Sequence, residues 1–229
     1  MPLSEKIESV LRRIREAALR AGRDPRDVTL VAASKSVTPE DVLEAFDAGV
    51  GDFGENRIQE AKKKMDALPG VPLRWHFFGH LQTNKANAAI DMGFEIIHSL
   101  DSVRLLGLLE NHAAKTGKSQ RALIEVKLSD EPSKHGATEE GLFEILHASG
   151  EKKAPHIKIE GLMTVPPYFS RPEEARPYFA RLRALREKAE GVFHLPHLSM
   201  GMSHDFEAAI EEGATMVRIG TLIFGGRTK

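Results

Sequence analysis

The sequence contains no cysteine among its 229 residues. This absence excludes disulfide bonds, thiolate metal ligands and cysteine nucleophiles together. The chain also lacks an excess of either charge, since 32 basic residues face 33 acidic ones and the net charge is −1. A balanced chain has no overall field that attracts nucleic acid or an anionic membrane. The basic run Lys62-Lys63-Lys64 lies among acidic residues and is interpreted as a solvated helix face. We therefore expect neither nucleic acid nor membrane as a partner.

Long apolar runs are missing as well. No stretch approaches the roughly 18 consecutive apolar residues of a membrane-spanning helix. The N-terminal residues MPLSEK have no apolar segment typical of a secretory signal. His80, His135 and His204 do not follow a metal-ligand spacing, so no metal is expected. These features predict a cytoplasmic protein without a metal.

Short apolar runs alternate with helical patterns along the chain. The predicted strands are 29–34, 51–54, 74–79, 94–98, 121–128, 157–165, 197–200 and 215–220. The predicted helices are 3–22, 39–48, 56–68, 84–92, 102–117, 138–149, 172–190 and 204–213. Thr38 and Asp101 are predicted N-caps. A helix between each pair of successive strands indicates a parallel sheet.

Eight such units predict an α/β fold, a single (β/α)8 TIM barrel in one domain that spans residues 1–229. The chain after the last strand is too short for a full helix, so the helix at 3–22 is expected to take the eighth outer position. An open, doubly wound sheet is the alternative, but no G-x-G-x-x-G follows the first strand. In a barrel, the loops after the strands form a common functional rim.

Lys35 follows the first apolar strand, at the rim that this fold predicts. A lysine at the end of a buried strand is desolvated, which disfavours its ammonium form and makes its amine a nucleophile toward an aldehyde. Glycine- and serine-rich turns follow the seventh and eighth strands, where barrels often bind phosphate. A Schiff-base lysine beside a phosphate site suggests pyridoxal 5'-phosphate (PLP). The alternative is an ordinary strand-end lysine in contact with water.

Several motifs occur in consistent order between residues 34 and 226. They are Ser34-Lys35, Gly54-Glu55-Asn56 with Gln59-Glu60, Trp75-His76-Phe77 with Gly79-His80-Leu81-Gln82 and Asn84-Lys85, Gly161-Leu162-Met163-Thr164, Ser199-Met200-Gly201-Met202-Ser203 with Asp205, and Val217-Arg218-Ile219-Gly220-Thr221 with Phe224-Gly225. In these motifs the chain resembles the pyridoxal phosphate homeostasis protein family, single-domain relatives of the alanine racemase barrel. Two departures are Thr83, where the family usually has serine, and the segment 127–136, which is looser than the family's glycine-bearing version.

The turns after the seventh and eighth strands supply the expected phosphate ligands. Ser199 and Ser203 offer hydroxyl groups, and the backbone N–H groups of Gly201, Gly220 and Thr221 can approach a phosphate closely. The alternative is that these glycines only end strands. We expect Ser199, Gly201, Gly220 and Thr221 to bind the cofactor, and Ser203 is an additional candidate.

Three further residues are candidates for contacts with the cofactor ring. Arg218 lies inside an apolar strand, where a charge is costly unless it is paired. The resemblance makes it the partner of the pyridine nitrogen, which a guanidinium would leave unprotonated; a structural salt bridge is the alternative. Asn56 could hydrogen-bond the ring oxygen or cap the next helix. His76 is expected to point inward, either over the cofactor ring or as a satisfied core histidine.

The resemblance implies a barrel of the alanine racemase N-terminal type that holds PLP as an aldimine on Lys35 and carries or buffers it within the cell. Apo forms of PLP-dependent enzymes are the candidate partners, and a monomer is expected. An unprotonated pyridine ring is a weak electron sink, so no catalytic residue is assigned and robust turnover is not expected.

Two enzyme functions remain as alternatives. A weak PLP-dependent amino-acid racemase would need a second acid or base, and the only tyrosines are Tyr168 and Tyr178. We expect no second domain to supply one. A Schiff-base aldolase also combines a lysine with a phosphate site, but its lysine usually lies on a later strand.

Overall fold

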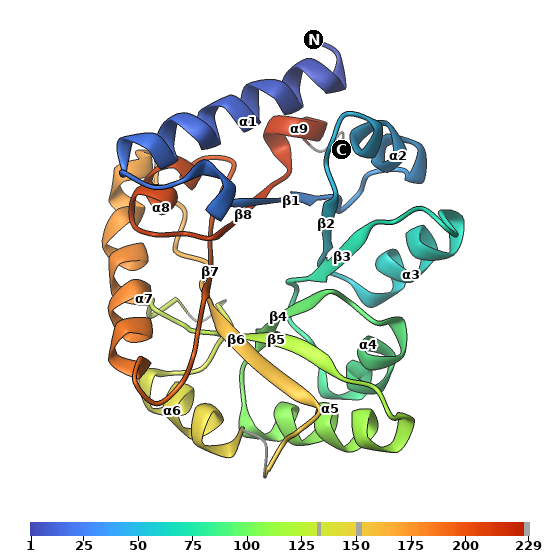
Figure 1. Cartoon of the computed structure of the whole chain (residues 1–229), viewed down its shortest axis with the longest axis vertical. Helices are drawn as coiled ribbons and strands as arrows, with labels where there is room; N and C mark the ends of the chain where they lie inside the picture. The colour runs from blue at the N-terminus through green and yellow to red at the C-terminus, as the bar shows by residue number, and fades with distance from the viewer. Residues whose placement is uncertain (132–133, 150–152, 227–229) are drawn as a thin grey trace.

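The protein is built around a closed barrel of eight parallel strands in chain order, surrounded by helices (Figure 1). The computed structural model describes residues 1–131, 134–149 and 153–226. The strands are β1 (Thr29–Ala33), β2 (Asp52–Glu55), β3 (Arg74–Phe77), β4 (Ile96–Leu100), β5 (Gln120–Glu125), β6 (Ile157–Met163), β7 (His197–Met202) and β8 (Met216–Ile219). The barrel closes between β1 and β8, where Leu30 pairs with Val217. The predicted α/β barrel is confirmed.

Helices fill the connections between the strands. The α-helices are α1 (Leu3–Arg20), α2 (Pro39–Asp47), α3 (Ile58–Ala67), α4 (Ala86–Met92), α5 (Val103–Thr116), α6 (Glu139–Ala148), α7 (Arg176–Ala189), α8 (Phe206–Glu211) and α9 (Thr221–Phe224). Three 3-10 turns precede or join them: η1 (Pro25–Asp27), η2 (Thr83–Lys85) and η3 (Pro172–Ala175). Each predicted strand and helix is present with its ends shifted by a few residues. Among the described residues, η1 and α9 were not predicted; with three and four residues they are too short to show a helical period.

The N-terminal helix α1 lies outside the barrel and contacts α8, α9 and α2 (Figure 1). Its apolar stripe, which includes Ile7, Val10 and Ile14, is buried. Arg13 donates from Nη2 to Glu207 of α8 at 3.0 Å. The expectation that this helix takes the eighth outer position is therefore confirmed. Within the described ranges, no helix combines the length and apolar character needed to cross a membrane.

One of the two predicted helix caps is correct. Thr38 forms a capping box with Asp41 at the start of α2: its Oγ1 accepts the Asp41 backbone N–H at 3.2 Å, and the carboxylate accepts the Thr38 N–H at 3.3 Å. At α5 the cap is Ser102, whose hydroxyl accepts the Leu105 N–H at 3.3 Å. The prediction of Asp101 is wrong by one residue, since its carboxylate accepts the Ser102 hydroxyl instead.

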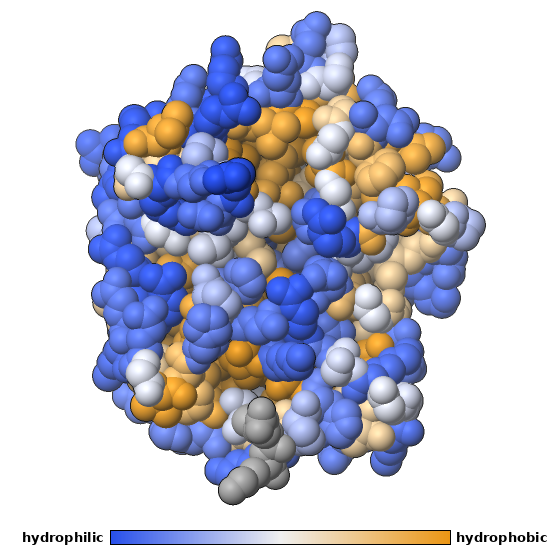
Figure 2. Space-filling model, in the orientation of Figure 1, coloured by the Kyte–Doolittle hydropathy of each residue, from blue (hydrophilic) through white to orange (hydrophobic). Residues whose placement is uncertain are grey.

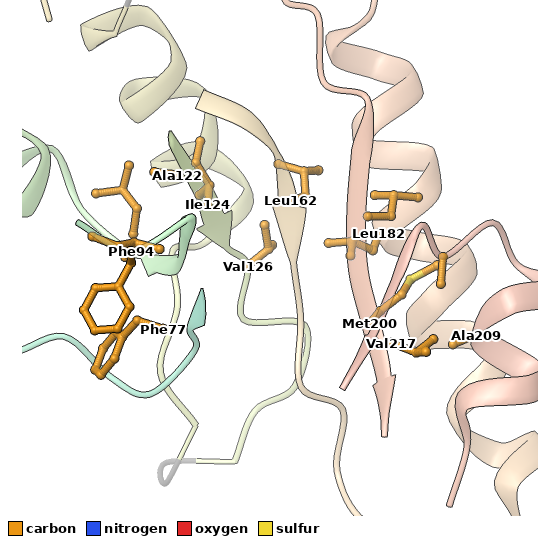
Figure 3. Packing of buried hydrophobic residues seen from close by; sticks show 14 of the residues in the cluster. Phe77, Phe94, Ala122, Ile124, Val126, Leu162, Leu182, Met200, Ala209 and Val217 are labelled. Carbon is orange, nitrogen blue, oxygen red and sulfur yellow. The ribbon is translucent and has the colours of Figure 1, made fainter. Parts of the chain in front are cut away.

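The main hydrophobic core lies between the barrel and the outer helices. Figure 3 shows Leu182 of α7 next to the strands, and Met200 and Val217 beside Ala209 of α8. On the opposite side of this view, the rings of Phe77 and Phe94 pack with centroids 5.4 Å apart. This layer fixes the helices against the strands and thereby the positions of the loops at the rim.

The barrel interior combines an apolar cluster with polar side chains. The apolar residues are Val31, Ile96, Leu123, Met163 and Met216. Residues two apart on a strand point to the same side, so His98 and Arg218 follow Ile96 and Met216 into the interior, where both are buried. The polar residues are the part of the interior that positions the candidate site.

Candidate functional site

Lys35 lies in a turn at the rim of the barrel, two residues after β1 ends at Ala33. The turn contains Ser36, whose φ of 64° is uncommon for a residue other than glycine. The Lys35 side chain is exposed. The expectation that burial desolvates it is therefore wrong, because the lysine follows the strand instead of ending within it.

A cleft of about 710 Å³ opens beside this turn, between α1, α2 and α9. Its lining brings Lys35 together with Gly220 and Thr221. These residues are far apart in sequence but follow the neighbouring strands β1 and β8. In Figure 2, hydrophobic atoms are exposed in the upper part of the face, where Figure 1 draws α9, and Ile223 and Phe224 of α9 line the cleft. Three of the predicted site residues therefore share one cavity.

A buried ion pair supports the Lys35 turn from inside the protein. Lys64 of α3 donates from Nζ to the Ser34 carbonyl oxygen at 2.5 Å and to Glu55 Oε1 at 2.5 Å. The Ser34 hydroxyl donates to the same Glu55 oxygen at 2.7 Å. Lys64 and Glu55 are 6% and 0% exposed, so the interpretation of the run 62–64 as a solvated face is wrong for Lys64. The ion pair fixes the residue directly before Lys35.

Asn56 follows β2 directly and is half-buried. It does not cap α3, whose N-cap is Arg57, so the helix-cap interpretation is wrong. Gly79 packs closely on Asn56, since a Cβ at Gly79 would lie 2.1 Å from the Asn56 carbonyl oxygen. Asn56 lines a second cavity, of about 200 Å³, with His80 and Lys85. Its predicted contact with the cofactor ring stays a prediction.

The turns after β7 and β8 meet at Ser203. Its hydroxyl oxygen accepts the backbone N–H groups of Gly220 at 3.3 Å and Leu222 at 3.5 Å. Gly220 also lies close to β1, because a Cβ on it would be 3.0 Å from the Ala33 carbonyl oxygen. Thr221 opens α9 and is exposed. The rim here presents hydroxyl and backbone N–H groups, which are the donors that an anion requires.

Gly201 is a glycine for reasons of packing. Its φ is 91°, in the region that favours glycine. A Cβ would lie 2.6 Å from the Ala209 Cβ and 2.9 Å from the Phe206 Cα, so a side chain would collide with α8. This contact explains the residue without a ligand. Its predicted contact with phosphate stays a prediction.

Arg218 is buried, as its apolar strand suggested, and is 4% exposed. It donates from Nη1 to Ser199 Oγ at 2.6 Å and from Nη2 to the Thr164 carbonyl oxygen at 3.0 Å. Burial lowers the pKa of Arg218 to about 10, against the opposing fields of Glu125 and Asp205. The guanidinium is therefore protonated at neutral pH. The salt bridge considered as an alternative is not found among the described residues.

Ser199 lies in the barrel interior, below the rim, and is fully buried. Its hydroxyl group contacts His98 Nδ1 at 2.8 Å in addition to Arg218. The serine at the rim beside Gly220 is Ser203, which the sequence analysis gave only as an additional candidate. A contact of Ser199 with phosphate stays a prediction.

His76 points into the barrel, while its neighbours Trp75 and Phe77 pack in the outer core, as alternation along the strand predicts. Its Nε2 contacts Asp52 Oδ1 at 3.0 Å and its Nδ1 contacts His98 Nε2 at 2.9 Å. Both ring nitrogens are thus engaged within the protein. These contacts are those of a satisfied core histidine, and the predicted position of His76 over the cofactor ring stays a prediction.

Glu125 ends β5 and is a buried titratable residue of the barrel that the sequence interpretation did not single out. It is 7% exposed, and its Oε2 has no hydrogen-bond partner among the described residues. Burial raises the pKa of Glu125 to about 7, although the field of Arg218 opposes this shift. A carboxyl group with this pKa can exchange a proton near neutral pH. The sequence feature that could have identified it is a glutamate within the apolar run 121–128, as Arg218 is an arginine within β8.

Two histidines lie on the rim near the 127–137 loop. The rings of His80 and His135 stack 3.9 Å apart, and His80 Nδ1 lies 3.4 Å from Asp101. In the ranges 1–131, 134–149 and 153–226, no three His, Asp or Glu residues are grouped so as to hold a metal ion. Pro132 and Ser133 of the loop lie outside the described residues.

Comparison with known proteins agrees with this architecture. The family described as alanine racemase, N-terminal domain, matches residues 6–228. The pyridoxal phosphate homeostasis protein of Aquifex aeolicus (strain VF5) is 47% identical over 229 residues, which cover 99% of each chain. The chain belongs to this family. A second pyridoxal phosphate homeostasis protein, from Pseudomonas aeruginosa, is 41% identical over 98% of this chain and 96% of its own length.

A solved structure with more than a third of its residues identical shows the same barrel. PipY of Synechococcus elongatus PCC7942, solved with PLP bound, is 35% identical. It has a TM-score of 0.82 and covers 98% of this chain and 100% of its own. The family predicted from the sequence motifs and the barrel of the alanine racemase type are therefore confirmed.

Proposed function

We propose that this chain binds PLP covalently through Lys35 and carries or buffers the cofactor within the cell, as one barrel domain over residues 1–229. The observation that carries the proposal is the shared cleft of Lys35, Gly220 and Thr221. It combines an exposed primary amine with backbone donors at the ends of two neighbouring strands. PipY, solved with PLP bound, supports the choice of cofactor.

The residues around the cleft fit a phosphorylated aldehyde. Ser203 and Thr221 offer hydroxyl groups to the phosphate. Gly220, whose N–H donates to Ser203 Oγ, leaves room for it beside β1 because it has no Cβ. Lys35 supplies the amine, which condenses with the aldehyde carbon to form a C=N bond with loss of water. This bond is reversible, so it both protects a reactive aldehyde and allows its release.

Arg218 affects which reactions the bound cofactor could support. We propose that it faces the pyridine nitrogen, with the guanidinium held by Ser199 and Thr164. Because it stays protonated, it would leave the ring nitrogen without a proton and the ring a weak electron sink. This arrangement favours storage of the cofactor over robust turnover.

In the part of the chain that the structure describes, neither tyrosine lies where the racemase alternative needs its second acid or base. Tyr168 is 81% exposed and packs against the ring of His204, and Tyr178 packs against Phe169. Neither tyrosine lines the Lys35 cleft among the described residues. A carrier therefore remains the better supported function.

Borohydride reduction tests the attachment directly. The protein loaded with PLP is reduced, digested and mapped by mass spectrometry, and we expect the pyridoxyl group on Lys35. Lys6 is the matched control, since it is the other lysine described in the cleft lining. Lys35→Ala should abolish the adduct and Lys6→Ala should retain it. An adduct mainly on Lys6 or Lys85 would contradict the proposal.

Delivery, location and assembly are tested separately. We propose a cytoplasmic monomer that hands PLP to apo-enzymes. Mixing the loaded protein with an apo-enzyme should restore that enzyme's activity, and light scattering should give the mass of one chain. A turnover number of about 1 per second or more with common amino acids would instead identify an enzyme.

A further inference from the structure

A continuous chain of hydrogen bonds crosses the barrel interior and ends on Arg218. It begins at the bidentate pair of Arg74 and Asp52 and continues through His76, His98 and Ser199 to Arg218. The contacts between successive members measure 2.6–3.0 Å. The chain passes from β4 to β7, which are not neighbours in the barrel order. It therefore connects side chains that backbone pairing does not hold together.

At the Arg218 end of the chain, the donor and the acceptor of the first hydrogen bond can be assigned. A guanidinium can only donate, so Ser199 Oγ is the acceptor of the 2.6 Å contact. The Ser199 hydroxyl hydrogen is then available for His98 Nδ1, 2.8 Å away. When Ser199 donates this hydrogen, His98 accepts at Nδ1, and the neutral ring then carries its own proton on Nε2. It follows that His98 donates to His76 Nδ1, the partner at 2.9 Å.

The Asp52 end of the chain fits the same order of donors and acceptors. Burial acts to raise the pKa of Asp52, but hydrogen bonds from His76 and Arg74 outweigh it and hold the pKa below its ordinary value. The carboxylate can therefore only accept, and His76 donates to it from Nε2 at 3.0 Å. In a neutral His76 ring, Nδ1 is then the acceptor. With both rings neutral, the two ends agree on one direction of donation, from the Ser199 hydroxyl through His98 and His76 to the Asp52 carboxylate.

The surroundings of His98 keep it in the neutral form that this order requires. His98 is fully buried, and burial lowers its pKa well below the ordinary value. His76 on β3 and His197 on β7 are titratable rings near it, and the Arg218 guanidinium on β8 adds a field that opposes a positive charge on His98. A neutral His98 has one donor and one acceptor, which are the two that its neighbours use.

We infer that His98 and His76 are positioning residues that hold Arg218, through Ser199, in the orientation in which it meets the cofactor ring. This inference rests on the proposed function, since it concerns the residue that faces the ring. Ser199 and the Thr164 carbonyl oxygen are the two partners recorded for the Arg218 guanidinium. The Ser199 hydroxyl can turn freely unless His98 fixes it. Loss of His98 would therefore release one of these two attachments.

Nuclear magnetic resonance of the cofactor-free protein tests the chain itself. With ¹⁵N-labelled histidine at neutral pH, we expect both His76 and His98 as neutral rings protonated on Nε2. Asp52→Asn should disturb the signals of both rings, because an amide can donate where the carboxylate only accepts. A doubly protonated ring, or a proton on Nδ1 of His98, would overturn the inference. This measurement does not depend on PLP.

Substitutions at His98 test the effect on the cofactor. His98→Gln keeps one donor and one acceptor, whereas His98→Leu removes both at a similar volume. We expect His98→Leu to weaken PLP retention by about tenfold, equivalent to about 1.4 kcal/mol, and to shift the visible absorption band of the bound cofactor. His98→Gln should restore both properties most of the way. Ser199→Ala breaks the chain at the next link and serves if His98→Leu does not fold.

Ile96→Ala is the matched control, since Ile96 is two residues earlier on β4 and lies in the barrel interior outside the chain. It should lower stability while leaving the absorption band in place. If His98→Leu and Ser199→Ala lose stability alone, with the band and retention of the wild type, the positioning role is wrong. If the wild-type protein itself gives no borohydride adduct, the proposed function fails, while the proton order in the apo-protein is still decided by the resonance experiment.

Discussion

Lys35 and Arg218 are two cations of the same proposed site, and the structure places them in opposite surroundings. Lys35 is exposed in a turn beyond β1, whereas Arg218 is 4% exposed inside β8. An amine that forms a bond must be reachable by the incoming aldehyde, while a fixed charge acts more strongly where water is excluded. In the proposed function, the rim would therefore make the amine of Lys35 accessible, and the barrel interior would hold Arg218 in a fixed orientation.

Two lysines near Ser34 differ in exposure in the same way. Lys35 follows Ser34 in sequence and is exposed, while Lys64 reaches the Ser34 carbonyl oxygen from α3 and is buried. Lys64 pairs with Glu55, so its charge is neutralised inside the protein. One lysine is therefore suited to chemistry and the other to holding the backbone from which that chemistry proceeds.

Reversal of the buried charge at Arg218 should have the largest effect. Arg218→Glu places a third carboxylate near Glu125 and Asp205, whose fields now act on the arginine. We expect a loss of about 5 kcal/mol in the free energy of unfolding, together with weakened PLP retention. Urea denaturation monitored by circular dichroism measures the first quantity. Arg104→Glu, at an exposed position on α5, should change stability by less than about 0.5 kcal/mol. Equal effects of the two variants would contradict the burial of Arg218.

Removal of the buried lysine should come next. Lys64→Met leaves the Glu55 carboxylate uncompensated, and we expect a loss of about 3–5 kcal/mol. The exposed neighbour provides the control, since Lys63→Met should stay within about 0.5 kcal/mol. In a double-mutant cycle, Glu55→Gln should recover much of the loss in the Lys64→Met background. Additive losses in that cycle would mean that the two side chains do not interact.

Glu125 should make the cofactor-free protein less stable as the pH rises. Its pKa is raised from 4.5 to about 7, so the folded protein binds the proton more tightly than the unfolded chain. The stabilisation is complete below about pH 4.5 and is lost as the pH rises to about 7, a change of up to about 3 kcal/mol. Denaturation midpoints across this range test the sign. Glu125→Gln should remove this part of the pH dependence, and Glu140→Gln, at an exposed position, should retain it.

Replacement of the exposed lysine should have the smallest effect on stability. Lys35→Ala removes a rim side chain without creating a core cavity, so we expect a change of no more than about 0.5 kcal/mol. The same variant should lose the absorbance of the bound cofactor completely. Thermal unfolding and a visible spectrum on one sample give both values. A large loss of stability would show that Lys35 has a structural role and would weaken the contrast with Lys64.

Much of the fold was predictable because it depends on local periodicity. The alternation of short apolar runs with helical patterns gave the parallel barrel, and the helical spacing of apolar residues in 3–22 gave α1. The cap at Asp101 was missed by one residue, since aspartate and serine are both good caps and only the backbone geometry selects Ser102. The helix α9 could not be found from a period that it is too short to display.

The site was predictable only in part. Lys35, Gly220 and Thr221 could be grouped because they follow strands that a barrel makes neighbours. The burial of Lys64 and the inward position of Ser199 could not, because each depends on which face of its element meets the barrel. Glu125 and Arg218 are both charged residues within apolar strands. The sequence analysis singled out only Arg218 on this ground.

The sequence by itself determined the barrel, its family and the identity of the lysine at the end of the first strand, since these depend on residue order and local pattern. Only the tertiary structure decided that Lys35 is exposed, that Lys64 is buried beneath its turn, and that Asp52, His76, His98 and Ser199 lead to Arg218. The physical reason is that a hydrogen bond or an ion pair depends on distances of about 3 Å. Such distances between residues far apart in the chain exist only after the strands have closed into a barrel.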